Sequence, residues 1–290
     1  MWLLCAFGSA FFAGVTAILA KQGLKGLDST VATALRTIVV ALFSWLMVLV
    51  TGSYLPLSSI PARSLVFLTL SGLATGASWL FYFHALQLGD VSKVTPIDKS
   101  STIMTMLLAA VFLGERLTVV RCADIVIIAV GTFLMIAPNR KKGKKKAPVK
   151  AEKGWFFCAL LSAVFASLTS ILGKVGIQDV PSTLGTALRT MIVLLMAWVM
   201  VFVTGKQSGL KRLERSGILP LVLSGITTGA SWLCYYHALQ TGPASVVVPI
   251  DKLSILITVA FSHFVLHETV SRRSQIGLAF ITIGTLALLM

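Results

Sequence analysis

Acidic residues are scarce in this chain, because ten aspartates and glutamates stand against 25 lysines and arginines among 290 residues. Charged residues of both signs make up 12%, whereas soluble domains contain about a quarter. Hydrophobic residues reach 56%, and the mean hydropathy is +0.90. A soluble globular domain is therefore excluded. The four cysteines lie inside apolar stretches without CxxC spacing, so we interpret them as small buried side chains and expect no metal site.

Catalytic and nucleotide-binding motifs are also missing from the sequence. It contains no HExxH, no GxSxG and no nucleotide-binding loop. We therefore expect no enzymatic activity, no cofactor and no ATP-driven transport by this chain alone. The chain begins Met-Trp-Leu-Leu without a basic segment, so we expect no cleavable signal peptide.

Long apolar stretches dominate what remains. A helix needs about 20 mostly apolar residues to cross a bilayer. Ten stretches come close to this length, near 2–20, 31–51, 64–86, 95–113, 120–137, 155–173, 184–204, 217–239, 247–266 and 274–290. They are too long, and alternate too little, for a transmembrane β-barrel. The predicted fold class is an all-α membrane protein with ten transmembrane helices, located in the plasma (cytoplasmic) membrane.

The sequence repeats itself with an offset of 153 residues. Positions 1–137 align without a gap to 154–290, and 57 of the 137 pairs are identical. We predict a first repeat over 1–138, a linker over 139–153 and a second repeat over 154–290. Each repeat has five predicted spans. Because five is odd, the second repeat must enter the membrane upside down, which gives the inverted repeat seen in many secondary transporters.

The linker carries a strong topology signal. Asn139–Lys153 has eight basic residues and one acid, and such segments stay in the cytoplasm. We therefore predict a cytoplasmic linker with both termini outside, and we expect no nucleic acid as a partner. Attraction to anionic lipid headgroups is a further expectation from the net charge of +15.

Ionisable residues recur inside the predicted spans, where each costs at least about 2.5–3.5 kcal/mol on insertion scales. We predict two clusters at opposite membrane faces. The inner cluster contains Lys21, Arg36, His84, Asp98, Lys99 and Glu268, and the outer cluster contains Lys174, Arg189, His237, Asp251, Lys252 and Glu115. Pairing of Arg36 with Asp98, and of Arg189 with Asp251, would close the two ends of a carrier. The alternative is that these pairs only neutralise charge and fix helix register.

Other repeated residues suggest cavity lining and packing. We expect Trp79, Tyr82, Trp232 and Tyr235 to line a cavity or to fill the bundle. Small-xxx-small spacing predicts close helix packing at Gly72, Gly76, Gly225 and Gly229. The histidines His84 and His237 are candidates for carrying protons or for hydrogen bonding within the bundle. Pro96 and Pro249 precede the Asp-Lys steps, which places Asp98 and Asp251 in the first turn of their spans.

These residues resemble the EamA branch of the drug/metabolite transporter superfamily. The likeness rests on the duplicated five-span unit, on GASWLFYFHALQLGDVSKVTPIDK from Gly76 and its copy from Gly229, and on FLGERLT at Phe112–Thr118. It implies a ten-helix carrier of small metabolites, often an exporter, with a central cavity lined largely by helices from the middle of each repeat. Each repeat is also similar to single-unit EamA proteins that pair to work. The copy of the FLGERLT segment in the second repeat departs from the family pattern, because His267 replaces the usual glycine before Glu268.

The predicted function is a secondary transporter, working by alternating access, for small polar or amphipathic organic metabolites such as amino acids. The expected partners are a small-molecule substrate, the lipid bilayer and protons as a candidate coupling ion, with the protein acting as a monomer. The alternative is a channel or a lipid-headgroup flippase on the same scaffold.

The inverted repeat makes a direct prediction about topology. The helices that carry Arg36 and Arg189 should begin on opposite surfaces of the membrane. A membrane-impermeant thiol reagent applied from outside should label a cysteine placed at the start of one of these helices and not of the other. Labelling of both from the same side would exclude the inverted arrangement.

Overall fold

The helices of this protein account for nearly all of its described structure. The computed structural model describes every residue except 24–26, 89–93, 95–96, 99, 117, 137–153, 213–214, 265–271 and 290. Among the described residues there are helices and no strands, which confirms the all-α class. The helices are α1 (Trp2–Gly23), α2 (Ser29–Val50), α3 (Ala62–Leu88), α5 (Ser101–Leu113), α6 (Val119–Ile136), α7 (Gly154–Gly176), α8 (Ser182–Val203), α9 (Arg215–Thr241), α10 (Ala244–Lys252), α11 (Ser254–Phe264) and α12 (Arg272–Ala287), with 3-10 turns at η1 (Leu57–Ser59) and η2 (Lys206–Arg212).

Apolar helix length makes this a membrane protein. Seven stretches of the described chain are long and apolar enough to cross a bilayer, namely Trp2–Ala20, Ser29–Val50, Ala62–Tyr82, Gly154–Gly176, Ser182–Val203, Ser216–Thr241 and Ala244–Phe261. The shorter α5 is also apolar. Large side chains such as Leu49, Phe133 and Val203 are exposed on the outside of the bundle, a surface that suits lipid better than water.

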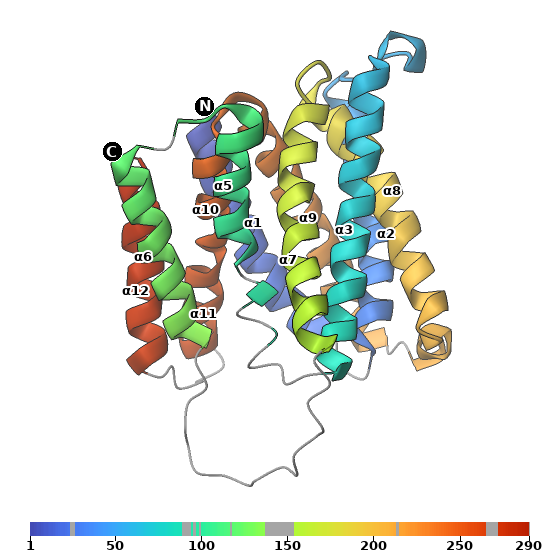
Figure 1. Ribbon diagram of the computed structural model, residues 1–290. Helices are drawn as coiled ribbons and strands as arrows, with labels where there is room; N and C mark the ends of the chain where they lie inside the picture. Colours follow the sequence, from blue (N-terminus) through green and yellow to red (C-terminus); the bar gives the residue numbers. More distant parts are fainter. Residues whose placement is uncertain are drawn as a thin grey trace, which may run out of the picture.

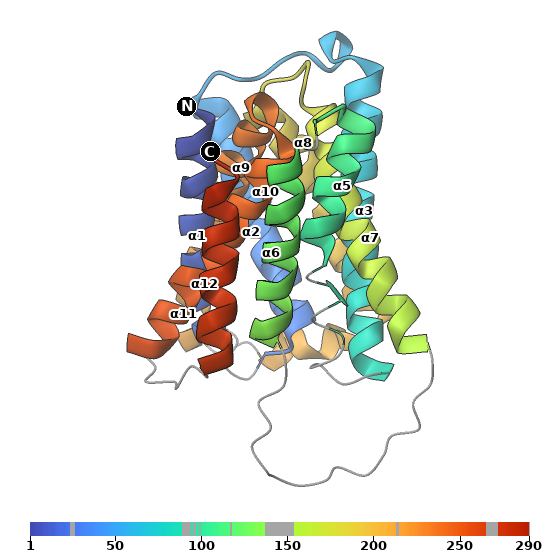
Figure 2. The same cartoon turned by 60° about the vertical axis from the view of Figure 1, so that its left-hand side comes forward.

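The helices pack mainly across the two repeats rather than within them. The most extensive contacts join α1 to α9 and α3 to α7, followed by α6 with α12 and α2 with α8 (Figures 1 and 2). If each helix is replaced by its copy, 153 residues away in the sequence, the same four helix pairs result. Figure 1 shows that α1 begins at the upper end of the bundle, where both chain ends lie, whereas α7 begins at the lower end.

The ninth predicted span is interrupted near its middle. α10 ends at Lys252 and α11 begins at Ser254. The N–H of Leu253, between them, donates to the carbonyl of Ile250 at 2.9 Å, one residue short of α-helical spacing. Asp251 therefore lies in the last turn of a nine-residue helix. The prediction that placed Asp251 in the first turn of a long span is wrong.

The physical reason is that α10 begins earlier than its sequence indicates. Pro243 is the N-cap residue, in an extended conformation, and Pro249 lies inside the helix instead of at its start. The side chain of Glu115, from the other repeat, accepts the N–H groups of Ala244 and Ser245. A carboxylate at this position satisfies donors that the helix itself leaves unpaired.

Glycines at two helix crossings allow the repeats to approach closely. A Cβ atom on Gly225 of α9 would lie 2.6 Å from Cβ of Val39 on α2, and 3.1 Å from the carbonyl oxygen of Arg36. Gly72 of α3 meets α8 in the equivalent way. Gly76 and Gly229 leave room for side chains on the same two partner helices. All four glycines of the predicted packing set therefore lie where a larger residue would collide with a neighbouring helix.

The Gly225→Ala change should destabilise the protein. The added methyl group meets a stiff β-branched side chain and the backbone of α2, and overpacking of this kind costs about 1–3 kcal/mol. Gly8→Ala is the matched control, because its Cβ would lie at an ordinary 3.6 Å from Sγ of Cys234. Thermal unfolding in detergent measures both variants. Equal unfolding temperatures would contradict the packing role.

Candidate functional site

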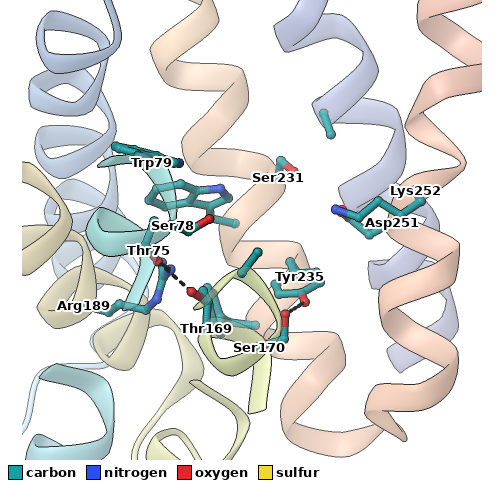
Figure 3. Close-up of a pocket in the computed structure, with 14 residues that line it drawn as sticks. Thr75, Ser78, Trp79, Thr169, Ser170, Arg189, Ser231, Tyr235, Asp251 and Lys252 are labelled. Carbon is teal, nitrogen blue, oxygen red and sulfur yellow. Dashed lines mark hydrogen bonds and ion pairs between the residues drawn. The ribbon is translucent and has the colours of Figure 1, made fainter. Parts of the chain in front are cut away.

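Two adjoining cavities lie between the repeats. The Arg189 cavity, of about 300 Å³, is lined by Ala13, Thr75, Ser78, Trp79, Ala166, Thr169, Ser170, Arg189, Ser231, Trp232, Tyr235, Tyr236, Asp251 and Lys252 (Figure 3). The Arg36 cavity, of about 370 Å³, is lined by Thr33, Arg36, Ser78, Trp79, Tyr82, Asp98, Ser101, Ala166 and Lys252. Four residues line both cavities: Ser78, Trp79, Ala166 and Lys252. Both volumes are near the lower end of the range for small-molecule sites, about 300–1,000 Å³.

The two cavities contain the same kinds of side chain. Each has one arginine and one aspartate, and Tyr82 of one cavity corresponds to Tyr235 of the other; the members of each pair are 153 positions apart. All four aromatic residues that the sequence suggested for a cavity line one or both of them, namely Trp79, Tyr82, Trp232 and Tyr235. The duplication of the sequence has therefore duplicated the chemistry of the site.

The carboxylate of Asp98 is held by a serine of the other repeat. Ser162, on α7, donates its hydroxyl to Oδ1 of Asp98 at 2.7 Å. Ser78, on α3, donates in turn to the carbonyl oxygen of Ser162 at 3.1 Å. Both serines are buried. This hydrogen-bonded group of residues joins α3, α7 and the segment before α5.

An equivalent group surrounds Asp251. Ser9, on α1, donates to Oδ1 of Asp251 at 2.6 Å, and Ser231, on α9, donates to the carbonyl oxygen of Ser9 at 3.0 Å. Each residue of this group is the copy of one in the Asp98 group. In both groups, therefore, the carboxylate of one repeat depends on a hydroxyl from the other.

Arg189 is buried, with 2% of its surface exposed, and is held by hydroxyls of α3. Its Nε donates to Ser71 at 2.9 Å and its Nη2 to Thr75 at 2.5 Å. The guanidinium also lies over the rings of Trp232 and Tyr236, at 5.2 and 4.8 Å from their centroids. Its Nη1 is buried and has no hydrogen-bond partner among the described residues. The charge is solvated by neutral groups, and one nitrogen remains unpaired among the described residues.

The predicted arginine–aspartate ion pairs are not found in the described structure. Arg189 contacts α3 hydroxyls, whereas Asp251 contacts Ser9 and lies 3.9 Å from Nζ of Lys252. Arg36 forms no ion pair with Asp98, and its Nε is buried without a partner. Hydroxyls of Ser9, Ser71 and Thr75 occupy the positions at which each member of the predicted pair of Arg189 and Asp251 would have met its charged partner.

The prediction of two clusters at opposite faces is also wrong in part. Lys252, assigned to the outer cluster, lines the Arg36 cavity together with Asp98 of the inner cluster. Lys252 also lines the Arg189 cavity. Lys252, next to the break between α10 and α11, thus lies between the repeats, because α10 ends midway along its span.

A third polar group, the Glu115 cluster, lies at the end of α5 and contains Glu115, Lys174, Gly242, Ala244 and Ser245. Lys174 donates to Oε1 of Glu115 at 3.3 Å and to the carbonyl oxygen of Gly242 at 2.6 Å. Glu115 accepts the N–H of Ala244 at 2.6 Å, and the N–H of Ser245 at 3.0 Å together with its hydroxyl. One carboxylate therefore connects the α5–α6 connection, the end of α7 and the start of α10.

Electrostatics favour the ionised form of Glu115. Burial alone would raise the pKa of this carboxyl group. The hydrogen bonds from Ser245 and Ala244 and the nearby charge of Lys174 outweigh burial, so the pKa lies below its usual value.

The remaining predicted site residues lie away from the two cavities or outside the described residues. His84 is exposed and lines a groove with Met200 and Thr204, and Nδ1 of His237 lies 3.3 Å from the hydroxyl of Ser182. Lys99 and Glu268 lie outside the described residues, and so does the side chain of Lys21. His84 and His237 therefore do not join the charged groups between the repeats.

Sequence reasoning missed the hydroxyl residues that hold these charges. A signal was present, because Ser9 and Ser78 are identical to their copies Ser162 and Ser231. It also missed Asp124 of α6, which is 3% exposed and has a buried Oδ2 without a partner among the described residues. The copy of Asp124 is Gly277, so the repeat gives no signal at this position.

An apolar helical bundle with charged cavities between two repeats fits a membrane transporter, and comparison with known proteins identifies its family. The model of the EamA-like transporter family matches residues 1–137 and 153–290, so the chain belongs to that family. The two matches correspond to the two repeats.

Individual relatives resemble single repeats of this chain. An "Uncharacterized transporter in cobO 3'region" from Sinorhizobium sp is 44% identical over 134 residues, which are 46% of this chain and 95% of that protein. An uncharacterized protein of Methanocaldococcus jannaschii is 27% identical over 138 residues, 44% of this chain and 91% of its own. A solved structure described as "Crystal structure of protein" has a TM-score of 0.81 at 18% identity, over 100% of this chain and 98% of that one, which establishes the fold alone.

Replacing Glu115 with glutamine should weaken the Glu115 cluster in a pH-dependent way. Because the folded-state pKa is below the unfolded value, the ionised carboxylate stabilises the fold at neutral pH, and this stabilisation is lost as the pH falls through the folded-state pKa. The Glu115→Gln variant should unfold at a lower temperature at pH 7, with a loss on the order of 1–3 kcal/mol.

Thermal unfolding of wild type and variant across acidic and neutral pH measures this effect. The difference should shrink on acidification. Asp179→Asn, at an exposed position, is the control and should show no such trend. A difference that stayed constant with pH would contradict the role given to the ionised carboxylate.

Proposed function

We propose that this protein is a secondary carrier that binds a small polar or amphipathic organic metabolite, such as an amino acid, between its repeats. The observation that carries the proposal is the pair of adjoining cavities with duplicated side chains, each lined from both repeats. A site built across two units is exposed alternately to the two sides when the units move against each other. Export is the proposed direction, as in many members of this family.

Ten spans in two inverted repeats form the proposed architecture. The exchange of helix contacts between the repeats supports a two-fold relation. The starts of α1 and α7 at opposite ends of the bundle support an inverted one (Figure 1). In this arrangement the basic linker lies in the cytoplasm and both chain ends lie outside, and the protein works as a monomer.

The Glu115 cluster is the proposed closure of the outer end. It ties the first repeat to both α7 and α10 through one ionised carboxylate. From the sequence repeat alone we propose a corresponding inner closure at Lys21 and Glu268, the copies of Lys174 and Glu115; Glu268 and the side chain of Lys21 lie outside the described residues. Alternating access requires that these two closures open in turn.

Protons are the proposed coupling ion, with Asp98 and Asp251 as the binding sites. Each carboxylate accepts a serine hydroxyl and lies at a cavity wall. Protonation would remove a charge at the boundary of the two repeats, and the serine could turn its hydroxyl to a new acceptor. Such a change couples proton binding to helix contacts.

Reconstituted protein tests the carrier directly. A thermal-shift panel of metabolites selects a ligand, since binding to the native state raises apparent stability. Proteoliposomes should then show saturable counterflow of that ligand, driven further by an imposed pH gradient. Single-channel conductance or lipid scrambling in place of counterflow would favour the channel or flippase alternative.

Asparagine variants test the coupling sites. Asp98→Asn and Asp251→Asn should retain counterflow. Their gradient-driven flux should fall at least about tenfold, which corresponds to about 1.4 kcal/mol. Asp179→Asn removes the same charge at an exposed position outside both cavities and is the matched control. Full gradient-driven flux in both cavity variants would exclude these carboxylates as proton sites.

A further inference from the structure

The charges that line the two cavities do not balance. Among the described residues, the lining includes the cations Arg36, Arg189 and Lys252 and the carboxylates Asp98 and Asp251. One positive charge is therefore in excess when all five are ionised. An uncompensated charge inside an apolar bundle is costly, so a ligand that supplies a negative charge is favoured there.

Arg189 carries a positive charge that no carboxylate of the described residues pairs. It is 2% exposed and its partners are the neutral hydroxyls of Ser71 and Thr75. Nη1 is buried and unpaired among the described residues. A guanidinium nitrogen is an obligatory donor, and the hydrogen bonds it makes to an ionised acceptor are about twice as strong as those between neutral groups. A carboxylate oxygen at this position would complete the site.

The acid across the cavity does not neutralise Arg189. Asp251 accepts from Ser9 at 2.6 Å and lies 3.9 Å from Nζ of Lys252. Figure 3 shows Arg189 and the Asp251–Lys252 pair on opposite sides of the cavity. Because Ser9 and Lys252 already contact Asp251, the ammonium group of a zwitterion would have to compete with them for this carboxylate.

The walls between these two ends are aromatic. Trp79 and Trp232 line the Arg189 cavity, and Trp232 also lies under the guanidinium. Indole faces favour flat or apolar ligand bodies. The cavity volume of about 300 Å³ limits the ligand to a small molecule.

We propose that the substrate is a small organic monoanion, whose carboxylate binds Nη1 of Arg189 and whose apolar body lies between Trp79 and Trp232. This inference rests on the proposed carrier function and narrows its substrate class. It favours organic acids over the zwitterionic amino acids considered above.

A series of four probes with one body and different charges tests the proposal on the unmodified protein. The probes are 3-phenylpropionate (anion), L-phenylalanine (zwitterion), 3-phenylpropanamide (neutral) and phenethylammonium (cation). Thermal unfolding and intrinsic tryptophan fluorescence measure binding. The anion should bind at least tenfold more tightly than any other probe. Equal or tighter binding of another probe, or no binding by any of the four, overturns the proposal.

Variants then locate the charge that is recognised. Arg189→Gln should weaken binding of 3-phenylpropionate by about 10- to 100-fold and leave binding of the amide unchanged. Arg189→Lys, which keeps the charge, should recover part of the loss. Arg121→Gln removes one positive charge outside both cavities, where Arg121 bonds the carbonyl of Arg116, and should leave the preference intact. An unchanged preference in Arg189→Gln overturns the assignment to Arg189.

Flux measurements separate this proposal from the carrier function. Binding of the anion to the Arg189 cavity without counterflow in proteoliposomes would contradict the carrier function and support the anion site. Counterflow that prefers L-phenylalanine to 3-phenylpropionate would support the carrier function and contradict the anion site.

Discussion

A charged side chain inside a bilayer must find its polar partners within the protein, because hydrocarbon supplies none. In this structure α3 meets that need with alternating glycines and hydroxyls. Gly72 and Gly76 bring α3 against α8, and the preceding residues, Ser71 and Thr75, then reach the guanidinium of Arg189. Close packing and charge solvation therefore depend on the same two turns of helix. The aspartates likewise take their hydroxyl partners from the opposite repeat, so the repeats cannot separate without leaving charges unpaired.

The sequence predicted those parts of the fold that depend on composition and length. Apolar stretches of about 20 residues become helices in almost any arrangement, and the offset of 153 marks equivalent positions. The start of α10 could not be predicted in this way. Its first N–H groups bond to Glu115, which lies 129 and 130 positions earlier, so the boundary is set by a tertiary contact rather than by local propensity.

The candidate site was predictable in its residue types but not in its pairing. Identity between the repeats selected the arginines, aspartates and aromatic residues that line the cavities. Simple charge complementarity then paired Arg189 with Asp251, whereas the structure gives each of them neutral hydroxyl partners. Serine and threonine are common in membrane helices for packing reasons, so their type alone does not distinguish a packing residue from one that solvates a charge. Their identity in both repeats was the more informative signal.

The two cavity arginines, unlike the two aspartates, do not have equivalent partners in the two repeats. Arg189 binds hydroxyls of α3, but the copies of those hydroxyls, on Ser224 and Thr228 of α9, bond to carbonyl groups of α9 and to Thr16, and Nε of Arg36 remains unpaired. Both repeats have the same arginine, serine and threonine at these positions, so the identity of these three residues does not explain the difference. A difference in conformation between the repeats would account for it. In the proposed carrier, reversal of the state would exchange these partners, so that Arg36 gains hydroxyls as Arg189 loses them. The cost of solvating one buried guanidinium is then offset by the release of the other, and the two states can remain close in free energy, as repeated transport requires.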